Sequence, residues 1–294
     1  MKPVHILLAL CVVAIWGTNF VALRYAVADF PPWLLLTLRH GCAALAMAGF
    51  ARWLPGQMRQ VFLISLSLGI VHFGFMTVAL QHLEAGTGAI LIQTAVPFAA
   101  LLAWLVFRDA FGWRRTAGMA AAFVGVGLIA GAPSVAGRID MVAVMLVSAA
   151  AFALANVQIK RLGGLNILAL NAWIAIFSAP QAALLSLAFE HGQAAALASA
   201  RWTGFAAIVY MALAVSFLSH SLWYRVVERY DTNQVMPFTL LVPVVAVAVG
   251  IAVLGETMTS AITAGGVLTI AGVAVIVTRR PDTAAVQPAL RARR

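Results

Sequence analysis

Hydrogen-bonding side chains lie inside stretches of the chain that are otherwise long and apolar enough to cross a membrane. The stretch "WGTNF" places Trp16 and Asn19 in the second half of an apolar run from Val4 to Leu23. An asparagine can hydrogen-bond a zwitterion, and a tryptophan can present an apolar wall with one polar edge. Such a pair suits a cavity for a small amphipathic molecule. The alternative, an asparagine that bonds the backbone of a neighbouring helix, stays open.

Further polar and aromatic side chains recur at helical spacing in other apolar stretches. His72, Phe75 and Met76 share one stripe of "GIVHFGFMTVAL", because residues three or four apart face the same side of a helix. The same reasoning adds Gln93 and Thr94, His220 and Trp223, and Asn156, which would mirror Asn19. Together they predict a substrate-binding cavity lined by aromatic rings and uncharged hydrogen-bonding groups, although ordinary packing is the alternative for each residue alone.

Arg39 is the cation that lies well inside an apolar stretch. Its burial without a partner would cost about 2.5–3.5 kcal/mol on an insertion scale. A substrate carboxylate is one candidate partner, so Arg39 joins the predicted substrate-binding residues. Because Arg39 follows Trp33 by about 9 Å of helical rise, it could instead reach the membrane surface or cap a neighbouring helix.

The acids and histidines bear on energy coupling. The acids fall in breaks, at segment ends or in the C-terminal tail: Asp29, Glu84, Asp109, Asp140, Glu190, Glu228, Asp231, Glu256 and Asp282. Proton and sodium coupling commonly uses a carboxylate within the bilayer, so facilitated transport without coupling is the simplest expectation. His40, His72 and His220 remain candidate proton carriers, since an unperturbed imidazole titrates at about pH 6.5.

Patterns typical of enzymes, cofactors and metals are missing from the sequence. The chain lacks a nucleotide-binding glycine loop, a paired-histidine zinc motif and a cysteine–histidine cluster. We therefore expect no catalytic residue, no cofactor and no metal site. A channel is a rival from another class, distinguished by conductance, and an intramembrane enzyme would need convergent acids that the segments do not hold.

The segments that must position these side chains are membrane helices. The composition, 63% hydrophobic and 10% charged with a mean hydropathy of +0.99, is that of a polytopic membrane protein. Short polar breaks separate apolar segments of membrane-spanning length at 4–24, 33–51, 61–80, 87–107, 116–132, 140–159, 165–189, 203–224, 233–254 and 260–278. The predicted fold class is an all-α polytopic membrane protein with ten transmembrane helices.

Basic residues are distributed unevenly over the breaks. With the N-terminus in the cytoplasm, the outer breaks hold only Arg138 and Arg201, and most other Lys and Arg residues fall on the inner side. This bias predicts a multi-pass protein of the inner (plasma) membrane with both termini in the cytoplasm. The net charge of +10 is then a matter of topology. The basic tail at 282–294 is expected near anionic lipid, with no nucleic acid as partner.

The two halves of the chain look like diverged copies. Recurring pairs are Asn19 with Arg24 and Asn156 with Arg161, Pro97 with Asp109 and Pro243 with Glu256, and Gly118 with Gly125 and Gly265 with Gly272. Each half holds five segments, and an odd number inverts the second copy in the bilayer. We predict two inverted five-helix repeats, 1–137 and 138–281, an architecture of secondary transporters that bind substrate at the repeat interface.

Prolines inside the segments are predicted gating kinks. Pro97, Pro237 and Pro243 each remove a backbone hydrogen bond and bend a helix. The near-repeat of Pro97 and Pro243 suggests that the fourth and ninth segments bend symmetrically and gate opposite faces. Glycines in the fifth and tenth segments are interpreted as packing sites that could also support a dimer, so a monomer and a homodimer both stay open.

Three stretches resemble a known family: "WGTNF" in the first segment, "FPPWLLLTLRH" entering the second, and "YDTNQVMPFTLLVPVVAVAVGIAVLGETMT" across the ninth. Over nearly its whole length the chain resembles the EamA-type transporters of the drug/metabolite transporter superfamily. Within it, the cysteine and O-acetylserine exporters and the YddG-type aromatic amino-acid exporters look most similar. The resemblance implies a ten-helix exporter of amino acids and related metabolites. Asp109 departs from the pattern, because the family more often has glutamate there, as the second half does at Glu256.

Together these observations predict an inner-membrane exporter of aromatic and other neutral amino acids or related metabolites that works by alternating access without coupling. The alternative is a broad-specificity drug/metabolite efflux transporter coupled to protons through histidine. Cationic cargo would favour a buried carboxylate, which the segments lack. The expected partners are a small-molecule substrate and the lipid bilayer.

Overall fold

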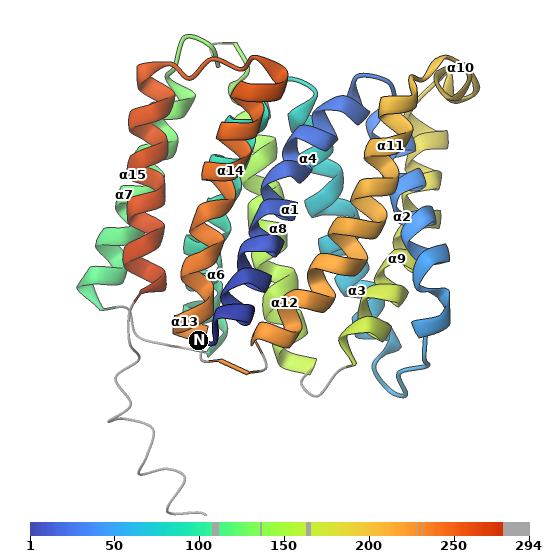
Figure 1. Cartoon of the computed structure of the whole chain (residues 1–294), viewed down its shortest axis with the longest axis horizontal. Helices are drawn as coiled ribbons and strands as arrows, with labels where there is room; N and C mark the ends of the chain where they lie inside the picture. The colour runs from blue at the N-terminus through green and yellow to red at the C-terminus, as the bar shows by residue number, and fades with distance from the viewer. Residues whose placement is uncertain (108–111, 136, 163–165, 228, 231, 279–294) are drawn as a thin grey trace, which may run out of the picture.

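The fold is a bundle of helices that run back and forth between two ends of the molecule (Figure 1). The computed structural model describes residues 1–107, 112–135, 137–162, 166–227, 229–230 and 232–278. Within these ranges every regular element is a helix, as lipid requires, since each backbone N–H and C=O must be paired inside the protein. Asp109 and the predicted basic tail lie outside the described residues.

The helices group into ten spans, numbered here in chain order. In the first half, the first span is α1 (Pro3–Val27), and the second is α2 (Pro32–Met47) with η1 (Ala48–Phe50). The third consists of α3 (Met58–Ile64), η2 (Ser65–His72) and α4 (Phe73–Leu80), the fourth of α5 (Ala85–Leu91), η3 (Ile92–Thr94) and α6 (Ala95–Phe107), and the fifth is α7 (Trp113–Ala130). In the second half, the sixth span is α8 (Ile139–Leu162), the seventh is α9 (Ile167–Phe189), and the eighth consists of α11 (Trp202–Tyr210), η4 (Met211–Ser219) and α12 (His220–Val227); the ninth consists of α13 (Thr232–Val235), η5 (Met236–Leu240), α14 (Leu241–Val249) and η6 (Gly250–Leu254), and the tenth is α15 (Ser260–Val277). The short helix α10 (Gln193–Ser199) lies in a predicted break.

The predicted all-helical, ten-span fold class is confirmed. Nine spans in the described ranges are long and apolar enough to cross a membrane. The other span is α7, which begins with the polar sequence Trp113–Arg114–Arg115 and packs along α15. Observed helices begin and end within a few residues of most predicted segments, because the polar breaks that separate them are short.

The packing of the spans has two-fold symmetry. A contact between two spans of the molecule recurs between the two equivalent spans of the other half. Equivalent spans meet directly where α2 packs on α9, α5 on α14, and α7 on α15. The third span packs on α8 through η2 and α4, and the eighth packs on α1 through α11, η4 and α12. In the same way α6 packs on α8 and α14 packs on α1. Such reciprocal contacts are those of two five-helix repeats in inverted orientation.

Four glycines let α7 and α15 approach closely, side by side in Figure 1. A Cβ added at Gly118 would lie 2.7 Å from the carbonyl oxygen of Gly272, and one at Gly125 would lie 2.5 Å from that of Gly265. The first glycine of each pair thus faces the second glycine of the other repeat, as a two-fold contact requires. Small residues at such seams bring helix backbones into van der Waals contact within lipid.

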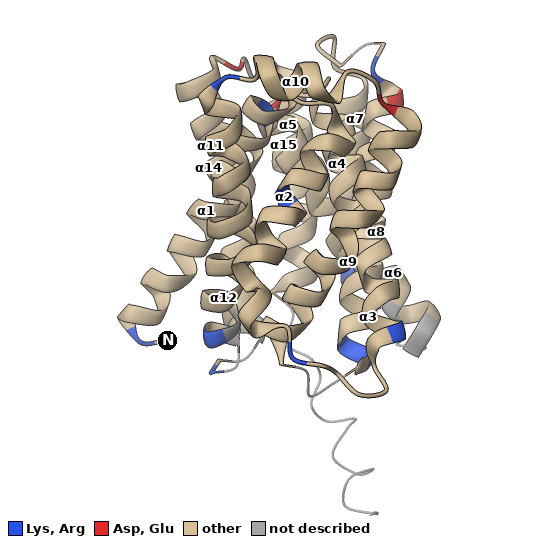
Figure 2. Ribbon diagram, turned by 90° about the vertical axis from the view of Figure 1, so that its right-hand side faces the viewer, with Lys and Arg blue, Asp and Glu red and all other residues tan. Residues whose placement is uncertain are grey.

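Charged residues gather at the two ends of the bundle (Figure 2). The described acids, Asp29, Glu84, Asp140, Glu190 and Glu256, all lie in connections or helix ends at one end, named here the acidic end. The opposite end, named the basic end, holds the N-terminus with Lys2, Arg52, Arg59, Arg114, Arg115, Lys160, Arg161, Arg225 and Arg229. The basic residues predicted to lie on one side thus gather at one end, while Arg24, Arg138 and Arg201 lie at the acidic end.

We expect Gly125→Ala to destabilise the protein by about 1–3 kcal/mol, the usual cost of overpacking a tight contact. Gly127→Ala in the same helix is the matched control, because a Cβ there meets no atom within 4 Å and alanine favours the helix over glycine by about 1 kcal/mol. Thermal unfolding of both purified variants in detergent measures the difference. Equal melting temperatures would contradict the close approach of α7 and α15.

Candidate functional site

Two π-helical segments, η2 and η4, interrupt the third and eighth spans at equivalent positions. A π-turn inserts one extra residue into an α-helix and is found frequently at functional sites. Polar side chains bond the carbonyl oxygens of both segments. His40 Nε2 donates to the Gly69 carbonyl oxygen at 3.2 Å, and the Ser216 hydroxyl donates to that of Met211 at 3.1 Å. Hydrogen-bonding side chains therefore lie beside both π-helical segments inside the bundle.

Each π-helical segment adjoins a histidine that packs on the first helix of the other repeat. His72, the last residue of η2, donates through Nδ1 to the Ser148 carbonyl oxygen at 3.2 Å, and the Ser148 hydroxyl donates to the His72 carbonyl oxygen at 2.8 Å. The His72 and Phe152 ring centroids are 4.8 Å apart. His220, the residue after η4, lies 5.9 Å from the Trp16 ring in α1. The two predicted histidines thus occupy equivalent interfaces.

Trp16 fastens α1 to the eighth span. Its indole Nε1 donates to the Ser219 hydroxyl at 2.8 Å, and its ring lies 5.0 Å from that of the buried Trp223. Farther along α1, the Thr18 and Tyr210 hydroxyls hydrogen-bond each other. The structure therefore brings together Trp16, His220 and Trp223, three of the predicted site residues.

Arg39 is buried in α2, with an exposed fraction of 1%. Its guanidinium carbon lies 4.0 Å from the centroid of the Phe73 ring, and Nη1 lies 4.0 Å from the Met211 sulfur. In the part of the chain that the structure describes, Nε and Nη2 have no hydrogen-bond partner. Arg39 therefore neither reaches the membrane surface nor caps a helix, and it bears the cost of a buried cation without a counter-ion.

The two predicted asparagines have different surroundings. Asn19 is 6% exposed, and its Oδ1 has no hydrogen-bond partner among the described residues. Asn156 is exposed, and its Nδ2 donates to the Phe152 carbonyl oxygen of its own helix at 2.8 Å. Asn156 therefore does not mirror Asn19, although the two lie in equivalent spans.

The remaining predicted side chains lie in separate places. Met76 belongs to the main hydrophobic core, whereas Phe75 is partly buried. Thr94 is fully buried and its hydroxyl donates to a carbonyl oxygen of its own turn at 2.7 Å. Gln93 Nε2 donates to the Thr239 carbonyl oxygen at 3.4 Å, which links the fourth span to the ninth.

The predicted gating prolines stand where regular helix is interrupted. Pro97 and Pro243 are each the third residue of an α-helix, in α6 and α14, and each helix directly follows a 3-10 segment, η3 or η5. Pro237 lies in the first turn of η5. A proline has no N–H to donate to the preceding turn, so the regular α-helical bonding breaks there. The fourth and ninth spans thus share one irregularity.

Four contact residues were missed by sequence reasoning: Phe73, Ser148, Met211 and Ser219. A period of 3.6 assigns faces only along an α-helix, and the extra residue of a π-turn shifts every face that follows. No periodic pattern marks the π-helical segments, so the sequence offered no signal for this shift.

Two hollows stand out in the described part of the surface. One of about 400 Å³ at the acidic end is lined by residues that include Asp29, Gln81, Glu190 and His191. The other, an open apolar groove of about 750 Å³, follows α15. Neither includes any of the predicted substrate-binding residues.

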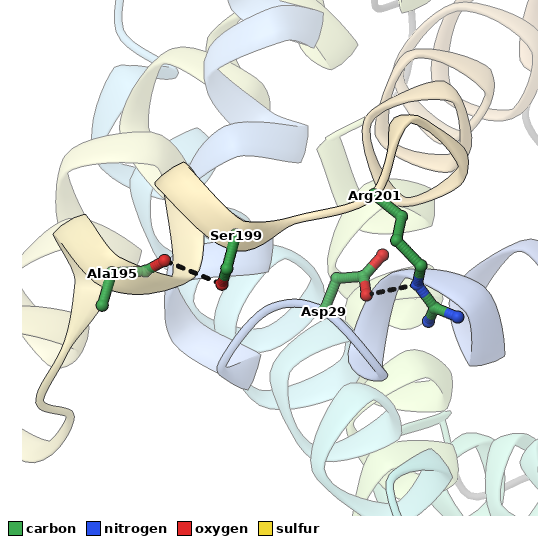
Figure 3. Close-up of polar contacts among 4 residues, drawn as sticks. All are labelled: Asp29, Ala195, Ser199 and Arg201. Atoms are coloured by element: carbon green, nitrogen blue, oxygen red, sulfur yellow. Dashed lines mark hydrogen bonds and ion pairs between the residues drawn. The ribbon is translucent and has the colours of Figure 1, made fainter.

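Carboxylates fasten the acidic end across the two repeats. Glu190 accepts hydrogen bonds at 2.7 and 3.0 Å from backbone N–H groups in the first turn of α2, and Glu256 accepts two at 2.5 and 3.0 Å from the start of α5. Asp29 pairs with Arg201 at 2.9 Å (Figure 3). Because unpaired N–H groups at a helix start favour negative charge, these bonds hold the acidic end closed.

Glu84 lies beside Glu256 in this closed end. Burial raises the pKa of Glu84, and the charge of Glu256 raises it further, while a hydrogen bond from the Thr257 backbone and the charge of Arg24 lower it. One Glu84 oxygen has no hydrogen-bond partner in the described ranges. The closed arrangement therefore favours the protonated form of this carboxyl group.

Comparison with known proteins places the chain among membrane transporters. A sequence model described as the EamA-like transporter family matches residues 4–131 and again 140–278. A Salmonella typhimurium protein named "Probable amino-acid metabolite efflux pump" is 30% identical over 274 residues, which cover 90% of this chain and 92% of that protein. An Escherichia coli protein of the same name is 28% identical, with 90% and 92% covered.

A solved crystal structure has the same fold. It superimposes with a TM-score of 0.63 over 95% of this chain and 100% of that chain, at 16% sequence identity. At that identity the likeness concerns the fold alone. A Pseudomonas aeruginosa protein of uncharacterized function is 31% identical, with 92% of this chain and 88% of that protein covered.

We expect the stability of the protein to fall as the pH rises above the ordinary Glu84 pKa of 4.5. A carboxyl group whose pKa is raised on folding binds protons more tightly in the folded state, so its favourable contribution is complete at low pH and is lost through the raised pKa. Glu84→Gln should weaken this pH dependence and raise the melting temperature at neutral pH. Asp140→Asn, at an exposed acid of the same end, is the control, and an unchanged pH profile for Glu84→Gln would contradict the expectation.

Proposed function

Because the chain belongs to the EamA-like transporter family, we propose that it exports neutral amino acids or related metabolites across the inner membrane by alternating access. The names of the Salmonella and Escherichia coli relatives support the amino-acid assignment. The inverted packing of the repeats supports alternating access, in which one half rocks against the other around a site at their interface.

The observation that carries the substrate class is the set of groups buried between the spans. Trp16, His220 and Trp223 offer aromatic surface, while Asn19 and Arg39 carry buried hydrogen-bonding atoms without partners among the described residues. An acceptor and a donor on apolar walls suit a small zwitterion. The described carboxylates lie at the acidic end, so cationic cargo would find no counter-ion between the described spans.

Transport without ion coupling is the proposed mode. Coupling would commonly use a carboxylate within the bilayer, and the described spans offer histidines instead. The alternative is broad-specificity drug or metabolite efflux driven by protons through His72 or His220. The equivalent positions of these histidines beside η2 and η4 favour that alternative, whereas the hydrogen bonds that tie His72 to Ser148 favour a packing role.

The charges support an orientation with the basic end in the cytoplasm, since Lys and Arg are retained on that side of membranes. Both termini would then be cytoplasmic, and substrate would leave at the acidic end. In this scheme the repeats are 1–137 and 138–281, and Pro97, Pro237 and Pro243 mark bending points of the fourth and ninth spans. The glycine seam of α7 and α15 is filled within one chain, which favours a monomer over a homodimer built on that seam.

Counterflow in proteoliposomes tests the proposed function. Vesicles preloaded with unlabelled threonine, methionine, cysteine or tryptophan should take up the labelled compound faster than protein-free vesicles. Trp16→Leu should slow uptake roughly tenfold, because it removes both a ring contact and a hydrogen bond. Trp202→Leu, at a tryptophan that is 79% exposed, is the matched control. The amino-acid assignment fails when none of the four compounds exchanges.

Uptake is expected to be equal at about pH 6 and about pH 7.5, the range over which a histidine carrier would change charge. His72→Gln should leave that equality intact and change the rate only modestly, since glutamine can still hydrogen-bond Ser148. Counterflow at both pH values, with and without an imposed proton gradient, provides the measurement. A pH dependence in the native protein that disappears in His72→Gln would favour proton coupling.

A further inference from the structure

Arg39 lies between the π-helical segments η2 and η4. It stacks on Phe73, the first residue after η2, and its Nη1 approaches the sulfur of Met211, the first residue of η4, each at 4.0 Å. An aromatic face and a thioether are weak partners for a guanidinium compared with an anion. Arg39 thus contacts the third and the eighth span, and none of the described carboxylates is its counter-ion.

The unpartnered atoms of Arg39 form one recognition edge. Nε and Nη2 are the two nitrogens without a hydrogen bond in the described part of the molecule. Their N–H groups point the same way along one side of the planar guanidinium, which is the edge that binds a carboxylate through two parallel hydrogen bonds. The buried side chain therefore presents a complete carboxylate-binding edge.

The described carboxylates of the chain lie at the acidic end and do not contact Arg39. Glu190 and Glu256 bind helix starts at the acidic end, and Asp29 pairs with Arg201 there. Glu84 and Asp140 also lie at that end. Because no described acid lies near Arg39, an anion for it has to come from outside the described residues.

We propose that Arg39 binds the carboxylate of the transported compound through Nε and Nη2, an inference that rests on the proposed function. The Phe73 ring and the Met211 sulfur hold the guanidinium when no substrate is bound. Substrate binding exchanges these weak contacts for a bidentate ion pair. The contacts of Arg39 with both irregular spans then connect occupancy of the site to the helices that pack on α1 and α8.

Asn19 supplies the complementary group for an ammonium. Its Oδ1 is a buried acceptor with no partner in the described ranges. Asn19 lies on α1 next to Thr18, which bonds Tyr210, while Arg39 on α2 touches Met211, the residue that follows Tyr210. The helices that carry the acceptor and the donor edge, α1 and α2, thus contact the eighth span at neighbouring residues, Tyr210 and Met211. The substrate class is a zwitterion with a free carboxylate.

The inference predicts discrimination against compounds without a carboxylate. Counterflow is measured with labelled L-methionine and L-methioninamide, and with L-tryptophan and L-tryptophanamide, in the native protein and in Arg39→Gln. We expect the native protein to favour each acid over its amide. Arg39→Gln should slow entry of the acids about ten- to hundredfold, the usual effect of losing hydrogen bonds to a charged group, and should change entry of the amides little.

Two further variants separate binding from packing. Arg39→Lys keeps the charge without the two-pronged edge and should show an intermediate acid-to-amide ratio. Arg24→Gln is the matched control, because Arg24 donates to backbone carbonyl oxygens of Leu80 and Gln81 at the acidic end, and its ratio should equal that of the native protein. A structural role for Arg39 would slow acids and amides equally.

The outcomes distinguish this inference from the proposed function. If the native protein exchanges none of threonine, methionine, cysteine and tryptophan, both the proposed function and the inference are contradicted. When the native protein exchanges them but Arg39→Gln keeps the native acid-to-amide ratio, only the inference is overturned.

A second variant covers an Arg39→Gln protein that does not fold. Phe73→Leu removes the ring that holds the free guanidinium. Its half-saturating concentration for methionine should fall about two- to fivefold, the worth of an ordinary cation–π contact. An unchanged or higher value would overturn the inference.

Discussion

Inside a bilayer no water is present to bond the polar groups of the backbone, so each N–H and C=O must find its partner within the protein. Regular α-helices meet this requirement by themselves, and most of the chain consists of them. Where η2 and η4 depart from α-helical geometry, side chains bond the carbonyl oxygens, as His40 does at Gly69 and Ser216 at Met211. The polar centre of the bundle therefore forms where the helices are irregular.

Each of the two repeats has to meet this hydrogen-bonding requirement, and this accounts for the symmetry of the helices around the site. Two copies of a five-helix unit in opposite orientation place η2 against α8 and η4 against α1. A histidine adjoins each segment, yet the two are held differently: His72 bonds Ser148, whereas His220 lies beside Trp16. The copies share a backbone arrangement and differ in side chains, so the symmetric frame carries different side chains at its two equivalent interfaces.

The described charged residues lie at the two ends of the bundle, apart from Arg39. Carboxylates at the acidic end bind helix starts of the opposite repeat, and these hydrogen bonds link the two repeats there. Arg39 lies between the spans, where it contacts the Phe73 ring and the Met211 sulfur, and no described carboxylate pairs with it. A site of this kind is costly without a ligand and favourable with one.

The sequence by itself determined the solvent, the span count and the repeat. Apolar segments of membrane length between short polar breaks leave helices as the solution in lipid, and the recurrence of Gly118 and Gly125 as Gly265 and Gly272 marked the seam of α7 and α15. Only the tertiary structure decided which side chains meet. Ser219 bonds Trp16 and Phe73 meets Arg39, each contact between two different spans. The tertiary structure also distinguishes Asn19, which is buried and whose Oδ1 has no partner among the described residues, from Asn156, which is exposed and bonded to its own helix. Sequence periodicity reports the faces of a regular helix, whereas these contacts depend on irregular backbone and on the packing of distant spans.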